Sequence, residues 1–291
     1  MVDTKSNTSP NAVTSRHGES TFGTTDGLTL YRQWWIPEAE PTAVVMVFHG
    51  LGEHSGRYGH VAEALNAAGY AVHAVDHRGH GKSEGKPVFV KSYGEFMSDL
   101  VLFRDLVETA HPGLPLFVLG HSMGGNLAVG HTLAHQDGLA GLALSGPALK
   151  VGDDITPIQV KLIGVLGRIV PGFRPQALDA SSISRDPAVV DAYRNDPLVY
   201  TGKMSAGIGW ALIERMEQFP SQYGELRLPV LLQHGTADQL ANVEGSRELE
   251  RLATNATVTS HYYEGLYHEI YTEPEQQTVL ADLVAWLGTI A

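Results

Sequence analysis

The sequence contains no cysteine among its 291 residues. This absence excludes disulfide bonds, thiolate metal ligands and a cysteine nucleophile, so any covalent catalyst must be another residue type. Basic residues are also few, with 20 Lys and Arg against 32 Asp and Glu, which gives a formal net charge of −12. We therefore do not expect binding to nucleic acid or to an anionic membrane through overall charge attraction.

Long apolar runs are missing as well. The sequence has no stretch of 18 uncharged apolar residues, and its polar N-terminal segment lacks the apolar centre of a secretory signal. We expect a cytoplasmic protein with a disordered leader over residues 1–19. Because 43% of the residues are hydrophobic, the rest of the chain can bury a sizeable core.

Short apolar runs, by contrast, recur along the chain, and most end in a turn that contains Gly or His. They are AVVMVFHG (43–50), YAVHAVDHRGHG (70–81), PLFVLGHS (115–122), LAGLALSGP (139–147) and PVLLQHGTAD (229–238), and a separate short run, VTSHYYEG (258–265), would be the last strand. Runs of this length and composition are typical of strands that are buried on both faces of a parallel sheet.

Segments with helical spacing lie between and after these runs, at VAEALNAAG (61–69), GEFMSDLVLFRDLVETAHPG (94–113) and VLADLVAWLG (279–288). The alternation predicts an α/β fold with a mostly parallel central sheet flanked by helices. In such open sheets the ligand site lies at the carboxyl ends of the strands.

Residues 149–210 interrupt this alternation. We predict that they form a cap, or lid, inserted into a core of residues 20–148 and 211–291. The segment is rich in Pro and Gly and still carries many apolar residues, among them Ile158, Val160, Leu162, Ile163, Val165, Leu166, Ile169 and Val170. These apolar side chains could line a substrate channel or cover the site as core.

Ser122 stands between glycines at the point where an apolar run ends and a helical pattern begins, in LFVLGHSMGGNLAVG. Gly120 and Gly124 permit a strand-to-helix turn too tight for side chains, which would lift the hydroxyl to the edge of the sheet. This is the nucleophile elbow of α/β hydrolases. The alternative is a serine that merely caps the helix, since serine is a favoured first residue there.

A serine hydroxyl needs a base to take its proton and an acid to orient that base, in the chain order Ser, Asp, His. Asp238 follows the run PVLLQHG, and His268 follows the last predicted strand. Glu264 is a weaker alternative to Asp238 because it lies too close to His268 in the sequence. His268 is chosen among 14 histidines because it alone lies in the loop after that strand.

Two backbone amides are expected to stabilise the oxyanion of the reaction. The segment FHGLGEHSGRY follows the first core strand with two glycines, and Leu51 lies between them. The second donor should be the amide of Met123, directly after the nucleophile. The alternative for the Leu51 loop is a plain strand-to-helix turn.

Six segments together resemble the monoacylglycerol lipases, particularly the bacterial enzymes. They are HGLGEHSGRY, DHRGHGKSEG, GHSMGGNLA, SRDPAVVDAYRNDPLVY, HGTADQLANVEGS and YEGLYHEIYTEP, and they occur in the family's order. The resemblance covers nearly the whole chain after the leader. It implies the α/β-hydrolase fold with a cap, and hydrolysis of monoacylglycerols to glycerol and free fatty acid through an acyl-serine.

The resemblance also implies roles for individual residues. The family's nucleophile, acid and base fall on Ser122, Asp238 and His268, and its oxyanion amides fall on Leu51 and Met123. Glu53 and Arg57 in the loop after the first core strand, with Tyr193 in the cap, would form the polar end of the pocket around the glycerol. The sequence departs at Asn242, where related sequences commonly have proline, and so loses a stiffer turn near the acid.

Other functions remain open. A general carboxylesterase, a lysophospholipase or a peptidase acting on small amides would share the nucleophile. A non-catalytic binding protein of the same fold would be expected to have lost one of the three residues. Haloalkane dehalogenases and epoxide hydrolases are disfavoured because they would have an aspartate in place of Ser122.

No organic cofactor or metal is implied. His73, His77 and His80 are close in sequence, but they span a predicted strand and a Gly-rich turn, and no nearby cysteine or carboxylate cluster completes a ligand set. The segment ITPIQVKLIGVLGRIVPGF is amphipathic and carries Lys161 and Arg168, with Arg174 directly after it and Asp153 and Asp154 just before it. We hypothesise that this part of the cap touches a membrane surface. The oligomeric state does not follow from the sequence.

Overall fold

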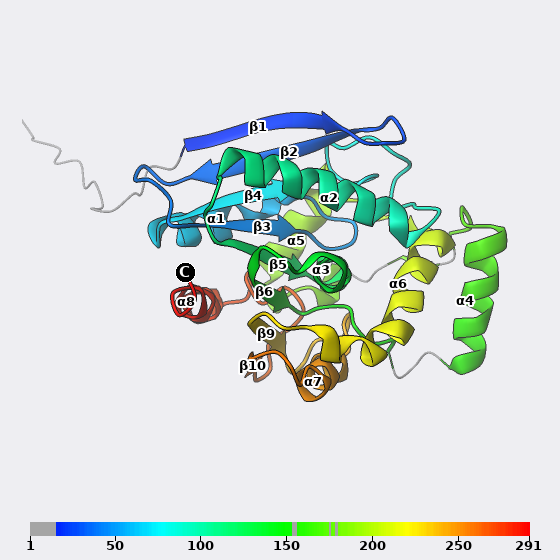
Figure 1. Ribbon diagram of the computed structural model, residues 1–291. Helices are drawn as coiled ribbons and strands as arrows, with labels where there is room; N and C mark the ends of the chain where they lie inside the picture. Colours follow the sequence, from blue (N-terminus) through cyan, green and yellow to red (C-terminus); the bar gives the residue numbers. More distant parts are fainter. Residues whose placement is uncertain (1–15, 153–155, 175, 178–179) are drawn as a thin grey trace, which may run out of the picture.

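The computed structural model describes residues 16–152, 156–174, 176–177 and 180–291. Its centre is an eight-stranded sheet in the order β1-β2-β4-β3-β5-β6-β9-β10. The strands are β1 (Arg16–Gly23), β2 (Thr29–Ile36), β3 (Ala43–Phe48), β4 (Tyr70–Val75), β5 (Leu116–His121), β6 (Leu139–Ser145), β9 (Val230–Gly235) and β10 (Val258–Tyr263). Within this order, the six strands from β4 to β10 pair in parallel, whereas β2 is antiparallel to both of its neighbours (Figure 1). The predicted mostly parallel sheet is confirmed.

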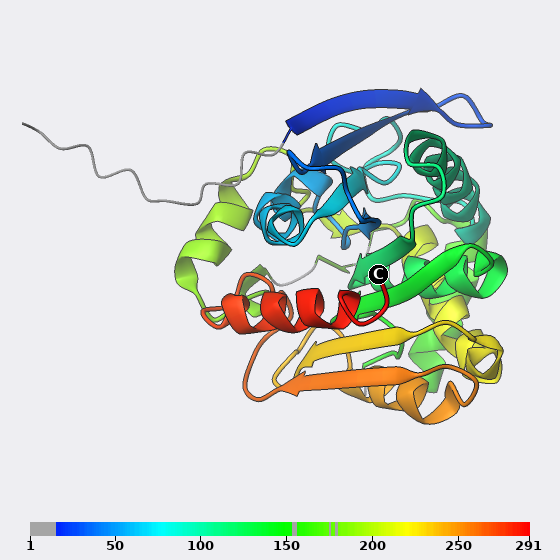
Figure 2. The ribbon, with the colours of Figure 1, turned by 60° about the vertical axis from the view of Figure 1, so that its left-hand side comes forward.

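Helices cover both faces of this sheet (Figures 1 and 2). One face packs against α1 (Gly59–Ala67) and α8 (Gln276–Leu287), and the other against α2 (Tyr93–Ala110), α3 (Met123–His135), α6 (Ala206–Gln218) and α7 (Val243–Leu252). An apolar core lies on each face of the sheet, and alternate residues of one strand belong to alternate cores, because successive side chains of a strand point to opposite faces. Val45 of β3 belongs to the α1 and α8 side, and Met46 to the other.

The hairpin of β1 and β2 at one edge of the sheet was not predicted. The two strands pair antiparallel over their whole length, beginning with Arg16 opposite Ile36. The prediction of a disordered leader over residues 1–19 is therefore wrong for residues 16–19; residues 1–15 lie outside the described residues. Pairing with β2 satisfies the backbone of β1, so this edge strand needs few apolar side chains of its own.

The chain between β6 and β9 contains α4 (Pro157–Ile169), β7 (Gln176–Ala177), α5 (Pro187–Asn195), β8 (Lys203–Met204) and α6. Helix α6 continues through residue 210, where the predicted cap ends, and its residues Ile208 and Leu212 belong to the core on the α3 side of the sheet. Asp153 and Asp154, which precede the basic segment in the sequence, lie outside the described residues.

Helix α4 packs mainly on α6 and turns a row of apolar side chains to the solvent. Ile158 is 79% exposed and Ile169 is 74% exposed, and Leu162 and Val165 are exposed between them. Neither a channel lining nor a core describes this row, so both interpretations of these four residues were wrong. Among the described residues, no helix has the length and apolar character that crossing a membrane requires.

Candidate active site

The parallel strands bring the predicted site residues to one edge of the sheet. Ser122 follows β5, Asp238 follows β9, and His268 follows β10, while the loop after β3 (residues 49–54, here the oxyanion loop) ends at the same edge. The loop of residues 266–272, which contains His268, is here called the base loop. Loops at the carboxyl edge of a parallel sheet meet there because all the strands point the same way.

Ser122 forms the turn between β5 and α3, and its backbone is strained. Its φ of 53° and ψ of −118° are unusual for any residue other than glycine, at a cost of about 1–3 kcal/mol. A side chain at Gly124 would collide with the carbonyl oxygen of Phe48, so the helix can lie this close to β3 only with glycine there. The Ser122 amide donates a hydrogen bond to Ser145 O at 3.1 Å, which fixes the turn.

Asp238 is held as a carboxylate by four hydrogen bonds. Its Oδ1 accepts from the amides of Leu240 and Ala241 at 2.8 and 2.9 Å, and its Oδ2 accepts from His268 Nδ1 at 2.7 Å and His234 Nε2 at 3.1 Å. Burial alone would raise the pKa of Asp238, but the two imidazoles hold it well below its usual range. The Asp238 side chain is fully buried and stays charged at neutral pH.

His268 receives its orientation from this carboxylate. Burial alone would lower the pKa of His268, but the Asp238 carboxylate raises it above the ordinary value of 6.5. Because Nδ1 donates to Asp238, Nε2 of the neutral imidazole is free to act as a base. The ring of His121, the residue before Ser122, lies 4.7 Å from the ring of His268 between centroids. The structure thus brings Asp238 and His268 into direct contact and places the Ser122 segment against them.

The oxyanion loop presents its backbone in a fixed orientation. His49 Nε2 accepts from the amide of His77 at 3.0 Å, so its Nδ1 carries the proton and donates to Gly50 O at 2.7 Å. In a trans peptide the next amide points away from that carbonyl, which turns the Leu51 N–H away from the His49 ring. Met123 is the first residue of α3, so its amide has no partner within the helix.

Glu53, Arg57 and Tyr193 lie together, as the resemblance implies. Glu53 Oε2 accepts from Arg57 Nη1 at 2.7 Å, and the Arg57 guanidinium lies 4.7 Å from the centre of the Tyr193 ring. Burial would raise the pKa of Glu53, but the guanidinium lowers it to about 2. Both oxygens of Glu53 have protein partners, because Oε1 accepts from the Gly50 amide at 2.5 Å and the Tyr58 hydroxyl at 2.7 Å.

Three further residues at this edge were not found by sequence reasoning. His234 holds Asp238, His121 packs on His268, and Glu269 binds Arg57. His234 carries a signal, since the His-Gly pair that ends β9 repeats the His49-Gly50 pair that follows β3. Asn242 also gains a role, because its side chain accepts from the amide of Glu244 at 3.0 Å and so begins α7.

The chain is similar in sequence to known proteins. Residues 39–275 match the family described as serine aminopeptidase, S33. The chain is 42% identical to a protein named monoacylglycerol lipase from Mycolicibacterium smegmatis, over 94% of this chain and 98% of that one. It is 34% identical to the monoglyceride lipase of Homo sapiens, over 90% and 88% of the two chains.

A solved structure shows the same likeness. The crystal structure of the monoacylglycerol lipase from Paleococcus ferrophilus is 34% identical, with a TM-score of 0.77, and the match covers 95% of this chain and 100% of that one. The predicted α/β-hydrolase fold and the resemblance found in the sequence are both confirmed.

Proposed function

We propose that the chain, which belongs to the serine aminopeptidase S33 family, hydrolyses monoacylglycerols to glycerol and free fatty acid. Its relatives identify it as a carboxylic ester hydrolase, because two of them are named monoacylglycerol lipase and monoglyceride lipase. The observation that supports this function most is the Asp238–His268 pair, buried and bonded at 2.7 Å, beside the strained turn at Ser122.

The reaction is acyl transfer through a serine ester. His268 Nε2 takes the proton of the Ser122 hydroxyl as its oxygen attacks the ester carbonyl, and Asp238 stabilises the imidazolium that forms. The amides of Leu51 and Met123 bind the oxyanion. The glycerol oxygen leaves with the proton from His268, and a water activated by the same imidazole then releases the fatty acid.

Arg57, Glu53 and Tyr193 form the polar end of the pocket in this proposal, under a cap of residues 149–210. Glu53 and Glu269 are both bound to Arg57. Neither carboxylate is therefore left to pair with the protonated amine of an aminopeptidase substrate, which favours a neutral ester over a small peptide.

A panel of substrates tests the choice of ester. Initial rates are measured on monoacylglycerol, diacylglycerol, lysophospholipid, a short aryl ester and an aminoacyl arylamide, with Ser122→Ala as the blank. We expect the highest kcat/KM on monoacylglycerol and no hydrolysis of the arylamide. A clear preference for lysophospholipid or for the arylamide would overturn the proposal, and equal rates on all esters would indicate a general carboxylesterase.

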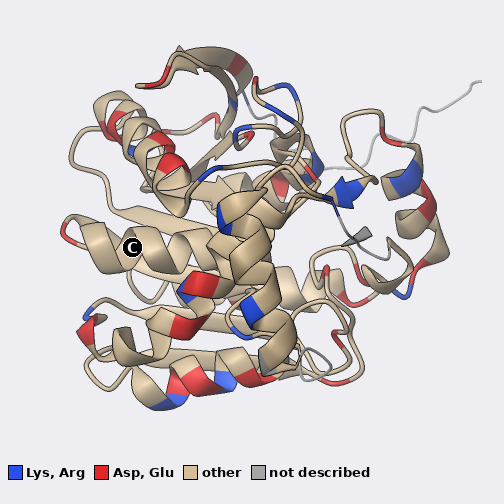
Figure 3. Ribbon diagram, turned by 90° about the vertical axis from the view of Figure 1, so that its right-hand side faces the viewer, with Lys and Arg blue, Asp and Glu red and all other residues tan. Residues whose placement is uncertain are grey.

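We also propose that α4 contacts the membrane surface in which monoacylglycerols reside. Its outward row is Ile158, Leu162, Val165 and Ile169, and Val170 and Phe173 extend the exposed apolar surface. The helix carries Lys161 and Arg168 and no acidic residue, whereas acidic residues are spread over other elements (Figure 3). An apolar face with basic flanks is the pattern of a helix that lies in a lipid interface.

Co-sedimentation with phosphatidylcholine vesicles, with and without anionic lipid, tests this contact. We expect the protein to sediment, and the double variant Ile158→Ser with Leu162→Ser to remain in solution. Ala188→Ser, at an exposed position of α5, is the control and should sediment like the unchanged protein. The absence of binding to every lipid mixture would contradict the proposal.

A further inference from the structure

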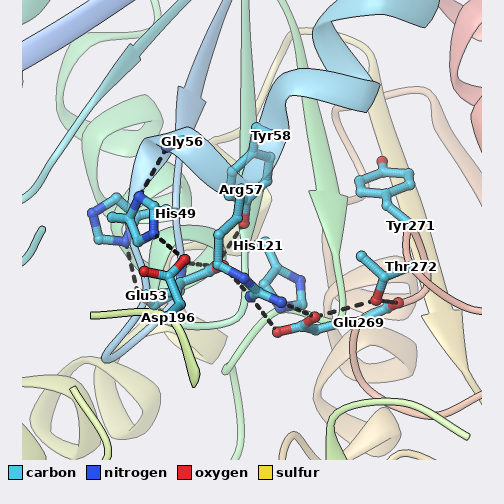
Figure 4. A network of polar contacts seen from close by, with 12 residues as sticks. His49, Glu53, Gly56, Arg57, Tyr58, His121, Asp196, Glu269, Tyr271 and Thr272 are labelled. Carbon is cyan, nitrogen blue, oxygen red and sulfur yellow. Dashed lines mark hydrogen bonds and ion pairs between the residues drawn. The ribbon is translucent and has the colours of Figure 1, made fainter. Parts of the chain in front are cut away.

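Arg57 joins two loops from opposite ends of the sequence. Its Nη1 donates to Glu53 Oε2 at 2.7 Å and to Glu269 Oε1 at 2.6 Å, and its Nη2 donates to Glu269 Oε2 at 2.8 Å. Glu53 belongs to the oxyanion loop, and Glu269 directly follows His268 in the base loop. Figure 4 shows the guanidinium between the two carboxylates. One side chain therefore fixes the distance between the loops.

These three side chains are buried together. The exposed fractions of Arg57, Glu53 and Glu269 are 14%, 5% and 8%. Removing one partner of a buried ion pair leaves an uncompensated charge, so this contact constrains both loops more than a surface pair would. The restraint reaches the backbone, because Glu53 accepts from the amide of Gly50, the residue before Leu51.

The same arginine sets the charge near His268. Asp238 is bonded to the His268 imidazole and to His234, and the His121 ring lies 4.7 Å from the His268 ring at a tilt of 49°. Glu269 and Glu53 lie farther away, and their negative charges also favour the imidazolium form. Arg57 carries the positive charge that balances these two carboxylates.

We propose that Arg57 is a positioning residue for acyl transfer, which fixes the oxyanion loop against the base loop and balances the two carboxylates near His268. The inference rests on the proposed function, because it assigns Arg57 a role in the same reaction. It goes beyond a contact with glycerol, because such a contact would matter only for glycerol esters. The proposed role affects every ester that the enzyme cleaves.

The test compares monoacylglycerol with a short aryl ester that lacks glycerol, using the pH profile of kcat/KM. Arg57→Met leaves Glu53 and Glu269 unbalanced, which stabilises the His268 imidazolium and withdraws the free base. We expect the limb that reports this base to move to higher pH by about one unit on both substrates. The rate at neutral pH should fall at least about tenfold on both.

Two further variants separate charge from geometry. Arg57→Lys keeps the charge but loses the two-pronged hydrogen bonding, so the limb should stay near that of the unchanged enzyme while kcat falls. Glu269→Gln removes one negative charge beside His268, so its limb should move to lower pH. Arg227→Met, an exposed arginine far from these loops in sequence, is the control and should leave both substrates unaffected.

The outcomes that would overturn the inference are distinct from failure of the proposed function. An aryl-ester profile unchanged in Arg57→Met, with a higher KM for monoacylglycerol alone, would mean that Arg57 only contacts glycerol. If Arg57→Met does not fold by thermal melting, Glu269→Gln decides, and an unmoved limb there contradicts the inference. An unchanged enzyme that cleaves the aryl ester but not monoacylglycerol would refute the substrate and still allow this test.

Discussion

Helices α4 and α5, which lie in the same stretch of chain between β6 and β9, use similar apolar side chains in opposite ways. Val165 of α4 is 52% exposed, whereas Val190 of α5 is 8% exposed. Val190 packs in a small core with Ile183, Tyr193 and Val199. The corresponding row of α4 faces the solvent, so residue type alone does not distinguish the two helices.

The two helices and the residues next to them also differ in their hydrogen bonds to the rest of the protein. Residues on either side of α5 are bonded to the oxyanion loop and the base loop, since the Tyr200 amide donates to Gly52 O at 2.7 Å and Ile183 O accepts from the Glu269 amide at 2.7 Å. Helix α4 packs on α6, where Gly164 and Gly167 lie against Trp210. The chain around α5 is therefore hydrogen-bonded to the oxyanion loop and the base loop, while the apolar row of α4 is exposed.

The largest effect is expected at Asp238, the acid of the proposed reaction. Asp238→Asn removes the charge that orients and stabilises the His268 imidazolium, so kcat on a short aryl ester should fall by about 10⁴-fold. Glu264→Gln, at the exposed acid that the sequence offered as an alternative, should change kcat little. A loss confined to Glu264→Gln would reverse the assignment.

A matched pair of arginines compares the anchoring of the two regions. Arg185 binds Glu273, whose side chain is fully buried, while Arg168 of α4 binds Glu214, whose side chain is 37% exposed. Arg185→Met should lower the free energy of unfolding by about 3 kcal/mol, because it leaves a buried carboxylate unpaired. Arg168→Met should cost less than about 1 kcal/mol. Urea unfolding measures both, and equal losses would break the comparison.

Two valines compare the apolar packing in the same way. Val190→Ala removes buried methyl groups, which should lower the free energy of unfolding by about 2 kcal/mol. Val165→Ala removes exposed ones and should change it by no more than about 0.5 kcal/mol. The measurement is again urea unfolding. A larger loss for Val165→Ala would place α4, and not α5, in the core of the cap.

The smallest effect is expected for soluble substrates when the outward row of α4 is changed. Ile158→Ser with Leu162→Ser should leave kcat/KM on a soluble aryl ester unchanged. The rate on monoacylglycerol held in vesicles should fall about tenfold or more, because less apolar surface is buried in the lipid. An equal fall on both substrates would show that these residues shape the site itself.

Much of the fold could be predicted from the sequence. The strands β3, β4, β5, β6 and β9 form near-continuous apolar runs, because both faces of each are covered by helices. The edge strand β1 could not be predicted, because RHGESTFG is polar and its pairing with β2 depends on backbone hydrogen bonds. The sequence could not decide whether the apolar face of α4 meets core, channel or lipid, since such a helical face has the same pattern in all three settings.

The site residues also differ in whether the sequence could predict them. Ser122, Asp238 and His268 were predicted from strand order, because each lies in the segment that follows a strand of the parallel sheet. Glu269 could not be found in this way, since its partner Arg57 is 212 positions away in the sequence. Nothing in a single sequence indicates that two side chains so far apart meet. Contacts between residues so distant in the sequence are seen only in the structure.

The most direct test of the central claim is the release of products from a pure monoacylglycerol. Glycerol and free fatty acid are quantified over time with the unchanged enzyme and with Ser122→Ala. The unchanged enzyme should form both products in equal amounts, and Ser122→Ala should form neither. Product release that persists in Ser122→Ala would contradict the assignment of the nucleophile, and an inactive unchanged enzyme would contradict the substrate.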